Sequence, residues 1–304
     1  MSNLLLLFTC LIAGLLLRRC GRVPDNAHQA LNGVIIHVAL PALTLRMLHG
    51  FTFDADHIWP VLMPWALFAI GAAVFWGFGR WLRLPRASIG ALTLVGGLGN
   101  TSFVGLPMIE SLHGRDGLAL GLLIDQLGSY LALSTVGVLA ATLYAAEERA
   151  SLRTMMVKVA SFPPFVALVV ALLLRPVPFP PAFDEALARI GDTLAPLALL
   201  SVGMQLRFEA LGEQARLLCL GLSYKLVACP ALVVAILLLA DAGTGTTQSV
   251  SVIEAAMPPM IGAGIVAAQA KLDAPLVSTM IGIGIPLGLS TAPAWHWLFG
   301  VLAA

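Results

Sequence analysis

The sequence predicts an all-α membrane protein that crosses the bilayer many times, and three observations lead to this fold class. Hydrophobic residues make up 59% of the chain and charged residues only 11%. The mean hydropathy is +0.93, so the apolar content exceeds what a soluble core could bury. The 304 residues divide into ten apolar runs, and a helix needs about twenty apolar residues to cross about 30 Å of hydrocarbon. We therefore expect a polytopic protein with ten transmembrane helices.

The predicted spans are bounded by charged residues, Pro and Gly, and they form two groups of five. They cover approximately residues 3–18, 31–48, 58–79, 87–112 and 117–145, and then 159–174, 187–206, 216–240, 247–270 and 274–301. The loops after odd-numbered spans hold twelve Arg and Lys residues, against four in the loops after even-numbered spans. By the positive-inside rule the odd-numbered loops are cytoplasmic, so both termini are expected outside.

A weak internal repeat relates the two groups of spans. The stretch GLLLRR at 14–19 resembles ALLLRP at 171–176, and HVALPALTLRM at 37–47 resembles DTLAPLALLSVGM at 192–204. Because each group holds an odd number of spans, the two copies would enter the membrane from opposite sides, as in many secondary transporters. We therefore predict one five-helix repeat over residues 1–148 and an inverted second repeat over 149–304.

The fourth and ninth spans contain residues that interrupt helices at corresponding places. Interior Gly costs about 1 kcal/mol and interior Pro about 3 kcal/mol relative to Ala, so we expect both helices to open. The residues responsible are Gly96, Gly97, Gly99, Gly105 and Pro107 in the fourth span, and Pro258, Pro259, Gly262 and Gly264 in the ninth.

Open backbone at mid-membrane depth indicates a polar cavity, because its N–H and C=O groups need protein, water or a ligand as partners. The half-helices beyond each break would present N–H groups and a positive dipole end, which suit an anion. Asn100, Thr101 and Ser102 add donors beside the first opening. The alternative is a pair of simple kinks in which small residues pack close to a neighbouring helix.

Three ionisable residues lie well inside predicted spans and are candidates for function: Asp125, Lys225 and Glu254. Charged groups in the bilayer are costly, so these residues are candidates for proton or ion coupling, or for charge pairing. Lys225 could instead extend to the cytoplasmic surface, and Glu254 could lie in the outer interface. Three polar residues share roughly one helix face with Asp125 and either line the cavity or hold helices together: Gln126, Ser129 and Tyr130.

Four stretches carry a resemblance to a known family. They are GNTSFVGLPMI (99–109), AAMPPMIGAGIVAAQAKLDAPLVSTM (255–280), HVALPALTLRML (37–48) and AFDEALARIGDTLAPLALLSVGMQL (182–206). These stretches resemble the signature regions of the auxin efflux carrier family, which includes plant PIN carriers and bacterial malonate transporters. The resemblance covers nearly the whole chain. The segment 145–158 is short, as in the bacterial members of the family, whereas many plant carriers have a long cytoplasmic loop there.

The resemblance implies ten helices in two inverted halves, with the broken fourth and ninth helices crossing at the substrate site. Spans 1, 2, 6 and 7 would form a scaffold, and spans 3–5 and 8–10 a transport domain that moves like an elevator. The implied cargo is a small organic anion, malonate or a similar carboxylate or an auxin-like molecule, carried across the bacterial cytoplasmic membrane. The residues carried over to the substrate site are Asn100, Thr101, Ser102 and Pro107 on one side and Pro258 and Pro259 on the other, and Gly262 completes our predicted set.

Other functions remain as alternatives. A sodium- or proton-coupled carrier of the bile-acid symporter or antiporter type would also cross two broken helices, and a passive channel or a membrane enzyme is a further alternative. The sequence contains neither a G-x-x-x-x-G-K-[ST] loop nor an H-E-x-x-H motif, so we expect no direct use of ATP, no catalytic residues, no metal site and no cofactor. The expected partners are an organic anion and the lipid bilayer; nucleic acid is not expected, and a homodimer stays open.

Overall fold

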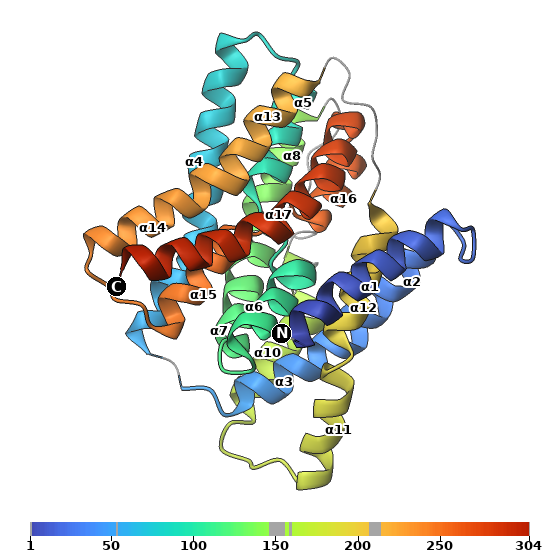
Figure 1. The fold of residues 1–304 in the computed structure, drawn as a ribbon, viewed down its shortest axis with the longest axis vertical. Helices are drawn as coiled ribbons and strands as arrows, with labels where there is room; N and C mark the ends of the chain where they lie inside the picture. The colour runs from blue at the N-terminus through green and yellow to red at the C-terminus, as the bar shows by residue number, and fades with distance from the viewer. Residues whose placement is uncertain (1, 53, 146–155, 158–159, 207–213, 304) are drawn as a thin grey trace. The chain divides into compact units, whose positions relative to one another are not determined.

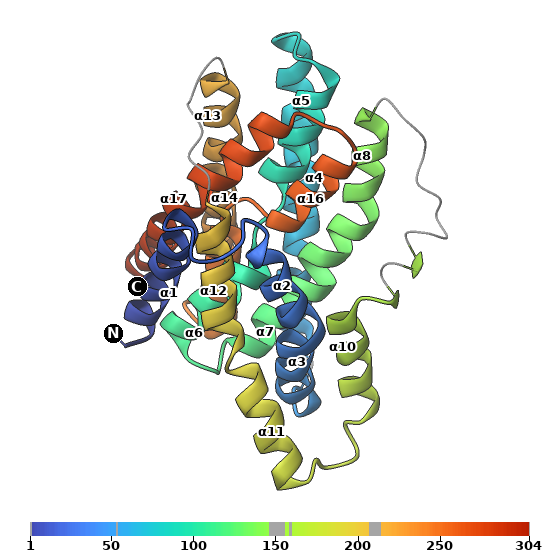
Figure 2. The same ribbon diagram turned by 90° about the vertical axis from the view of Figure 1, so that its right-hand side faces the viewer.

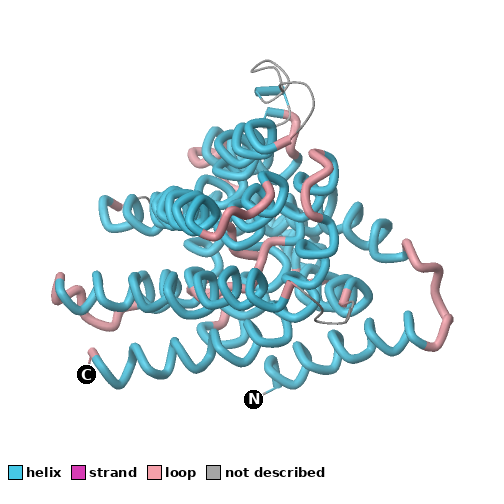
Figure 3. The backbone as a smooth tube through the Cα atoms, turned by 90° about the horizontal axis from the view of Figure 1, so that it is seen from above, coloured by secondary structure: helices cyan, strands magenta, loops and turns pink. Residues whose placement is uncertain are grey.

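The computed structural model describes residues 2–52, 54–145, 156–157, 160–206 and 214–303. All regular structure in these residues is helical, except for one antiparallel bridge between Gly99 and Pro259 (Figure 3). The chain forms two compact units. The first unit consists of Met1–Ala55, Ser102–Leu122 and Met156–Leu206, and the second of Asp56–Thr101, Leu123–Met155 and Arg207–Ala304.

The helices of the first unit are mostly short segments that continue one another (Figure 1). They are α1 (Ser2–Arg19), α2 (Ala27–Val34), η1 (Ile35–Ala39), α3 (Leu40–His49), α6 (Leu106–His113), α10 (Pro163–Leu173), α11 (Pro181–Gly191) and α12 (Leu194–Gln205), together with most of η4 (Thr101–Gly105) and α7 (Leu118–Leu123). The elements η1 and η4 are π-helical turns.

Glycines bring α1 and α12 into backbone contact in the first unit. A Cβ added to Gly203 would lie 2.1 Å from the carbonyl oxygen of Leu11, and one added to Gly14 would lie 2.2 Å from that of Leu200. Figures 1 and 2 show the two helices side by side. Small residues at such crossings let helices approach where there is no hydrophobic force between them, so packing between backbones holds this pair.

The second unit contains the longest helices and most of the π-helical turns. Its helices are α4 (Ile58–Trp81), α5 (Arg86–Ala91), α8 (Val138–Tyr144), α13 (Ala215–Ser223), α14 (Cys229–Leu239), α15 (Thr246–Ala255), α16 (Ile261–Gln269) and α17 (Ala274–Leu302), and its π-helical turns are η3 (Leu92–Gly96), η5 (Ile124–Tyr130), η6 (Leu133–Gly137) and η7 (Tyr224–Ala228); the 3₁₀ turn η2 (Ala55–His57) precedes α4. Helix α17 packs against α13, α15 and α16, and Figure 1 shows it as one long red helix.

Within the described residues, six helical segments are long and apolar enough to cross a membrane. They are Ala27–His49, Ala55–Trp81, Leu118–Tyr144, Pro181–Gln205, Ala215–Leu239 and Ala274–Leu302. Each overlaps a span predicted from the sequence, which agrees with a polytopic all-α protein. The count of ten helices and their inverted repetition stay predictions, and the proposed repeat boundary at 148 and 149 lies outside the described residues.

The opening of the fourth span is narrower than the sequence suggests. We expected the helix to open within 96–107, but the chain leaves helical geometry only at 98–100 and then continues through η4 into α6. Pro107 is the second residue of α6. In a regular α-helix a Pro ring clashes with the carbonyl four residues earlier. Here that carbonyl belongs to η4, and because a π-helical turn is wider than an α-helical turn, the ring is accommodated and the helix continues. Pro41 after η1 and Pro230 after η7 repeat this arrangement.

Candidate functional site

The two interrupted segments meet within the second unit. The backbone N–H of Asn100 donates to the carbonyl of Pro258 at 2.7 Å, and that of Met260 donates to the carbonyl of Leu98 at 3.1 Å. Residues 98–100 and 256–260 are all buried. Each break therefore satisfies part of the other's backbone, and fewer groups are left for water or a ligand than the sequence alone suggested.

Helix α17 supports the two prolines of the ninth span. A Cβ added to Gly284 would lie 2.6 Å from Cδ of Pro259, and one added to Gly288 would lie 2.6 Å from Cβ of Pro258. These glycines are four residues apart and so lie on one face of α17. Sequence reasoning missed them, although a Gly-x-x-x-Gly spacing in an apolar helix is a signal for close helix packing.

Asp125 lies in the π-helical turn η5 and is 1% exposed. Its Oδ1 accepts a hydrogen bond of 2.5 Å from Oγ1 of Thr101, which links η5 to the first break. The turn is held on α4, because Nε1 of Trp65 donates to the carbonyl of Leu127 at 2.9 Å and a Cβ added to Gly128 would lie 2.8 Å from Cγ of Pro64. The structure therefore brings Asp125 to the interrupted segments.

Lys225 lies in the π-helical turn η7 and is 2% exposed. It does not extend to the surface: its ammonium Nζ donates to the carbonyl of Ala255 at 3.1 Å, at the C-terminal end of α15 where the helix dipole favours a cation. Its side chain also lies beside Gly99, where an added Cβ would be 3.2 Å from Cε of Lys225. The hydroxyl of Tyr224 fixes the turn by donating to the carbonyl of Leu67.

Glu254 is the penultimate residue of α15 and is 2% exposed. Both carboxyl oxygens are buried and accept no hydrogen bond from any residue that the structure describes. The group interacts electrostatically with Asp125 and Lys225. The second unit therefore gathers two acids and one base around the bridge between the breaks, and Glu254 is buried there.

The three residues predicted to share a face with Asp125 differ in their surroundings. Gln126 and Ser129 are buried, at 0% and 1% exposed, and Tyr130 is partly exposed and shares a hydrogen bond with Ser134. Gly262 is the second residue of α16, where an added Cβ would lie 3.3 Å from a side-chain carbon of Leu133. Gly262 is thus at the start of the half-helix that follows the second break.

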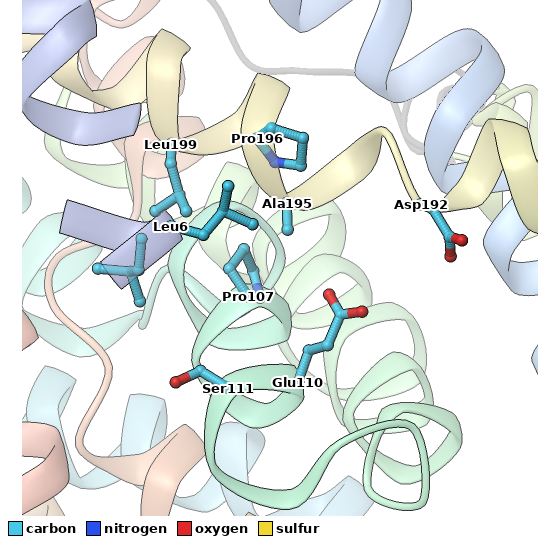
Figure 4. Close-up of a pocket in the computed structure, with 9 residues that line it drawn as sticks. Leu6, Pro107, Glu110, Ser111, Asp192, Ala195, Pro196 and Leu199 are labelled. Carbon is cyan, nitrogen blue, oxygen red and sulfur yellow. The ribbon is translucent and has the colours of Figure 1, made fainter. Parts of the chain in front are cut away.

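Two predicted site residues, Ser102 and Pro107, belong to the first unit. Pro107 lines a cavity of about 110 Å³ whose wall is mostly apolar. Figure 4 shows Pro107 near Ala195 and Pro196, with the carboxylate of Glu110 beside them. The full lining is Leu6, Leu7, Pro107, Glu110, Ser111, Asp192, Ala195, Pro196 and Leu199. In the described part of the chain, His, Cys, Asp and Glu do not form a group that could hold a metal ion.

Sequence comparison relates the chain to known membrane transport proteins. A family model described as Membrane transport protein, which represents the auxin efflux carriers, matches residues 1–296. The chain belongs to this family. It is also similar to a protein of Methanothermobacter thermautotrophicus that is named an uncharacterized transporter, with 25% identity over 97% of this chain and 96% of that protein. A second uncharacterized transporter, from Methanocaldococcus jannaschii, is 22% identical over 98% of each chain.

Membership of this family makes the chain a multi-pass membrane protein with a role in membrane transport. The match covers almost the whole chain, so it includes both interrupted segments and all three buried ionisable residues. A transporter family also favours transport over catalysis as the activity of this chain.

Proposed function

We propose that the protein is a secondary transporter of a small organic anion, malonate or a similar carboxylate. In this proposal the ten spans form two inverted five-helix repeats, over residues 1–148 and 149–304, in the bacterial cytoplasmic membrane with both termini outside. Spans 1, 2, 6 and 7 act as the scaffold. Spans 3–5 and 8–10 act as the transport domain, which carries the bound anion across by an elevator motion.

The observation that carries this proposal is the buried ammonium beside two bridged helix breaks. Lys225 is 2% exposed and lies against Gly99, at the bridge itself. A cation held in a low-dielectric interior attracts a carboxylate far more strongly than it would in water. The breaks supply backbone donors and polar side chains next to it, which gives the site both charge and hydrogen bonds for an organic anion.

The proposed substrate contacts come from both breaks. Asn100 is the last residue of the first break and Thr101 begins the turn that follows it. Gly262 is the second residue of the half-helix after the second break, whose N-terminal N–H groups have no side-chain cap. Free N–H groups at a helix start favour an anion. The residues we propose for substrate binding in the second unit are Asn100, Thr101, Pro258, Pro259 and Gly262, with Gln126, Ser129 and Tyr130 lining the path; Ser102 and Pro107 of the first unit stay predictions from the sequence.

The test is uptake of labelled malonate into liposomes that contain the purified protein. We expect exchange of external labelled malonate for internal unlabelled malonate without ATP. Replacing sodium by choline distinguishes this proposal from the alternative, a sodium-coupled carrier with the same crossing. A sodium-coupled carrier would stop exchanging malonate in choline, whereas the proposed transporter would continue. An ATP requirement, or sustained ion currents across a planar bilayer, would overturn the proposal.

The variants of this test target the second break. The double change Pro258→Ala with Pro259→Ala restores two backbone N–H donors and removes the two proline rings that pack on α17. We therefore expect the second break to become helical and malonate exchange to be lost. Pro293→Ala is the matched control, because Pro293 lies inside the continuous helix α17. Wild-type exchange by the double variant, with a circular dichroism spectrum showing a folded protein, would contradict the proposed site.

A further inference from the structure

We propose that Glu254 is a proton-binding site and that one proton travels with each organic anion in the same direction. This inference rests on the proposed function and deepens it, because it names the coupling of the same site. It starts from the one ionisable side chain in the cluster for which the described residues provide no hydrogen-bond donor.

The surroundings of Glu254 favour its neutral, protonated form. A buried carboxylate without hydrogen-bond donors loses its hydration, and no protein hydrogen bond compensates for this loss. Glu254 is also one residue before the end of α15, where the helix dipole is negative and disfavours a second negative charge. Asp125 differs, because it accepts a hydrogen bond from Thr101. Of the two acids, Asp125 is therefore the one that carries the charge balancing Lys225.

The charged groups that act on Glu254 are few. Asp125 and Lys225 interact with it electrostatically. Helix α15 packs against α4, α14 and α17, whose ionisable residues are Arg80, Cys229 and His296 respectively; the turns η5 and η7 add Tyr130 and Tyr224. With Lys225 positive, Asp125 negative and Glu254 protonated, the cluster of Asp125, Lys225 and Glu254 has no net charge.

Charge balance then couples proton and anion. A substrate carboxylate beside Lys225 adds one negative charge, which opposes ionisation of Glu254 and keeps its proton bound. When the anion leaves, the ammonium faces one negative charge fewer, and ionisation of Glu254 becomes less costly. The step is a simple protonation. On one side of the membrane an O–H bond forms between a carboxylate oxygen of Glu254 and a proton from the water, and on the opposite side this O–H bond breaks and the proton returns to the water. One proton on Glu254 offsets the single carboxylate group that lies beside Lys225, and the second carboxylate of malonate stays outside this balance.

By linkage, the proton and the anion each raise the affinity of the protein for the other. Two consequences can be measured. A pH gradient that is acidic outside drives net accumulation of malonate inside liposomes. In detergent, at a pH high enough to ionise both malonate and Glu254 of the empty protein, binding of malonate takes up about one proton per anion.

The experiment compares wild-type protein, Glu254→Gln, Glu254→Asp and the control Glu185→Gln in the same liposomes. Glu185 is an exposed acid of α11 that pairs with Arg189, so its change leaves the buried cluster intact. We expect Glu254→Gln, which mimics the protonated group, to keep malonate exchange of the wild-type order, to lose accumulation driven by the pH gradient, and to take up no proton on binding. Glu254→Asp keeps a titratable group and is expected to retain part of the accumulation.

The two levels of the proposal fail differently. If wild-type protein exchanges malonate but a pH gradient drives no accumulation, or if Glu254→Gln accumulates malonate as the wild type does, the coupling is overturned and transport of the anion stands. If the wild-type protein neither exchanges nor binds malonate, the proposed function falls and the coupling falls with it. Loss of malonate exchange in both Glu254→Gln and Glu254→Asp, with both proteins folded, would assign Glu254 to the architecture of the site and also overturn the proton site.

Discussion

The two compact units differ most in where they keep their polar groups. Of the fifteen buried polar or charged residues that the structure describes, thirteen lie in the second unit. The ion pairs of the first unit, such as Arg115 with Asp192 at 2.7 Å and Arg189 with Glu185 at 2.6 Å, are partly or largely exposed. The second unit instead buries Asp125, Lys225 and Glu254 next to interrupted helices.

This difference indicates a division of tasks. Exposed ion pairs contribute little to stability, so the first unit depends on close packing of apolar and small residues. Buried charges are costly and are kept where function needs them. The second unit therefore carries the chemistry that could bind an anion and a proton. The following predictions test this comparison by changing one kind of interaction at a time.

The largest effect is expected from Lys225→Met in the second unit. Removing the ammonium leaves the buried acids of the cluster without a positive charge near them, and an uncompensated buried charge costs about 3–5 kcal/mol. Unfolding of the detergent-solubilised protein with increasing dodecyl sulfate measures the loss. The double variant Lys225→Met with Asp125→Asn is expected to recover part of this stability, since no uncompensated charge remains. Additive losses in this double-mutant cycle would show that the two charges do not interact.

Gly203→Ala in the first unit is expected to cost about 1–3 kcal/mol, because overpacked sites force neighbouring groups apart. Its new Cβ would lie 2.1 Å from the carbonyl oxygen of Leu11, so α1 and α12 have to separate. Gly77→Ala is the control, since an atom added there meets nothing within 4 Å and helix propensity predicts a gain of about 1 kcal/mol. Thermal unfolding followed by intrinsic fluorescence compares the two; equal midpoints would argue against backbone packing as the basis of the first unit.

Thr101→Val keeps the shape of the side chain but removes the hydroxyl that donates to Asp125. We expect a loss of about 1–2 kcal/mol in unfolding free energy, because the acceptor is a buried carboxylate. The same variant should lower malonate affinity in the liposome assay, since Asp125 loses its fixed position beside the first break. The change Thr142→Val provides the comparison, because its hydroxyl only bonds back to its own helix, at the carbonyl of Leu139.

The smallest effect is expected from Arg189→Ala in the first unit. Arg189 and Glu185 are 78% and 63% exposed, and exposed pairs four residues apart on a helix contribute about 0.3–0.5 kcal/mol. Stability and transport should therefore stay close to wild type in the same dodecyl sulfate titration and uptake assays. A loss as large as that of Lys225→Met would remove the contrast between exposed and buried charges on which the comparison depends.

Several features could be predicted from the sequence because they depend on local composition. The apolar runs located helices such as α4 and α17 within a few residues of their observed ends. Pro258 and Pro259 located the second break, since a residue without an N–H cannot continue the hydrogen-bond ladder. The buried charges Asp125, Lys225 and Glu254 were found as ionisable residues inside apolar runs.

Other features were missed because they depend on neighbours distant in sequence or on backbone register. The π-helical turns η5 and η7, which contain Asp125 and Lys225, follow no simple residue pattern. Gly284 and Gly288 have meaning only with Pro259 and Pro258 packed on them. Pro107 was expected inside the opening, but the π-helical turn before it lets the helix continue.

The sequence by itself determined that this chain is a membrane protein of apolar helices, two of which break, and that three charged side chains lie within the apolar runs. Hydrophobicity and missing backbone donors are properties of each residue and its near neighbours, so a sequence can carry them. Only the tertiary structure decided that the two breaks pair with each other and that Asp125, Lys225 and Glu254 share one buried cluster. The pairing of the breaks and the approach of Asp125 to Glu254 depend on packing between segments more than a hundred residues apart in the chain, where a shift of one helical turn would separate the charges.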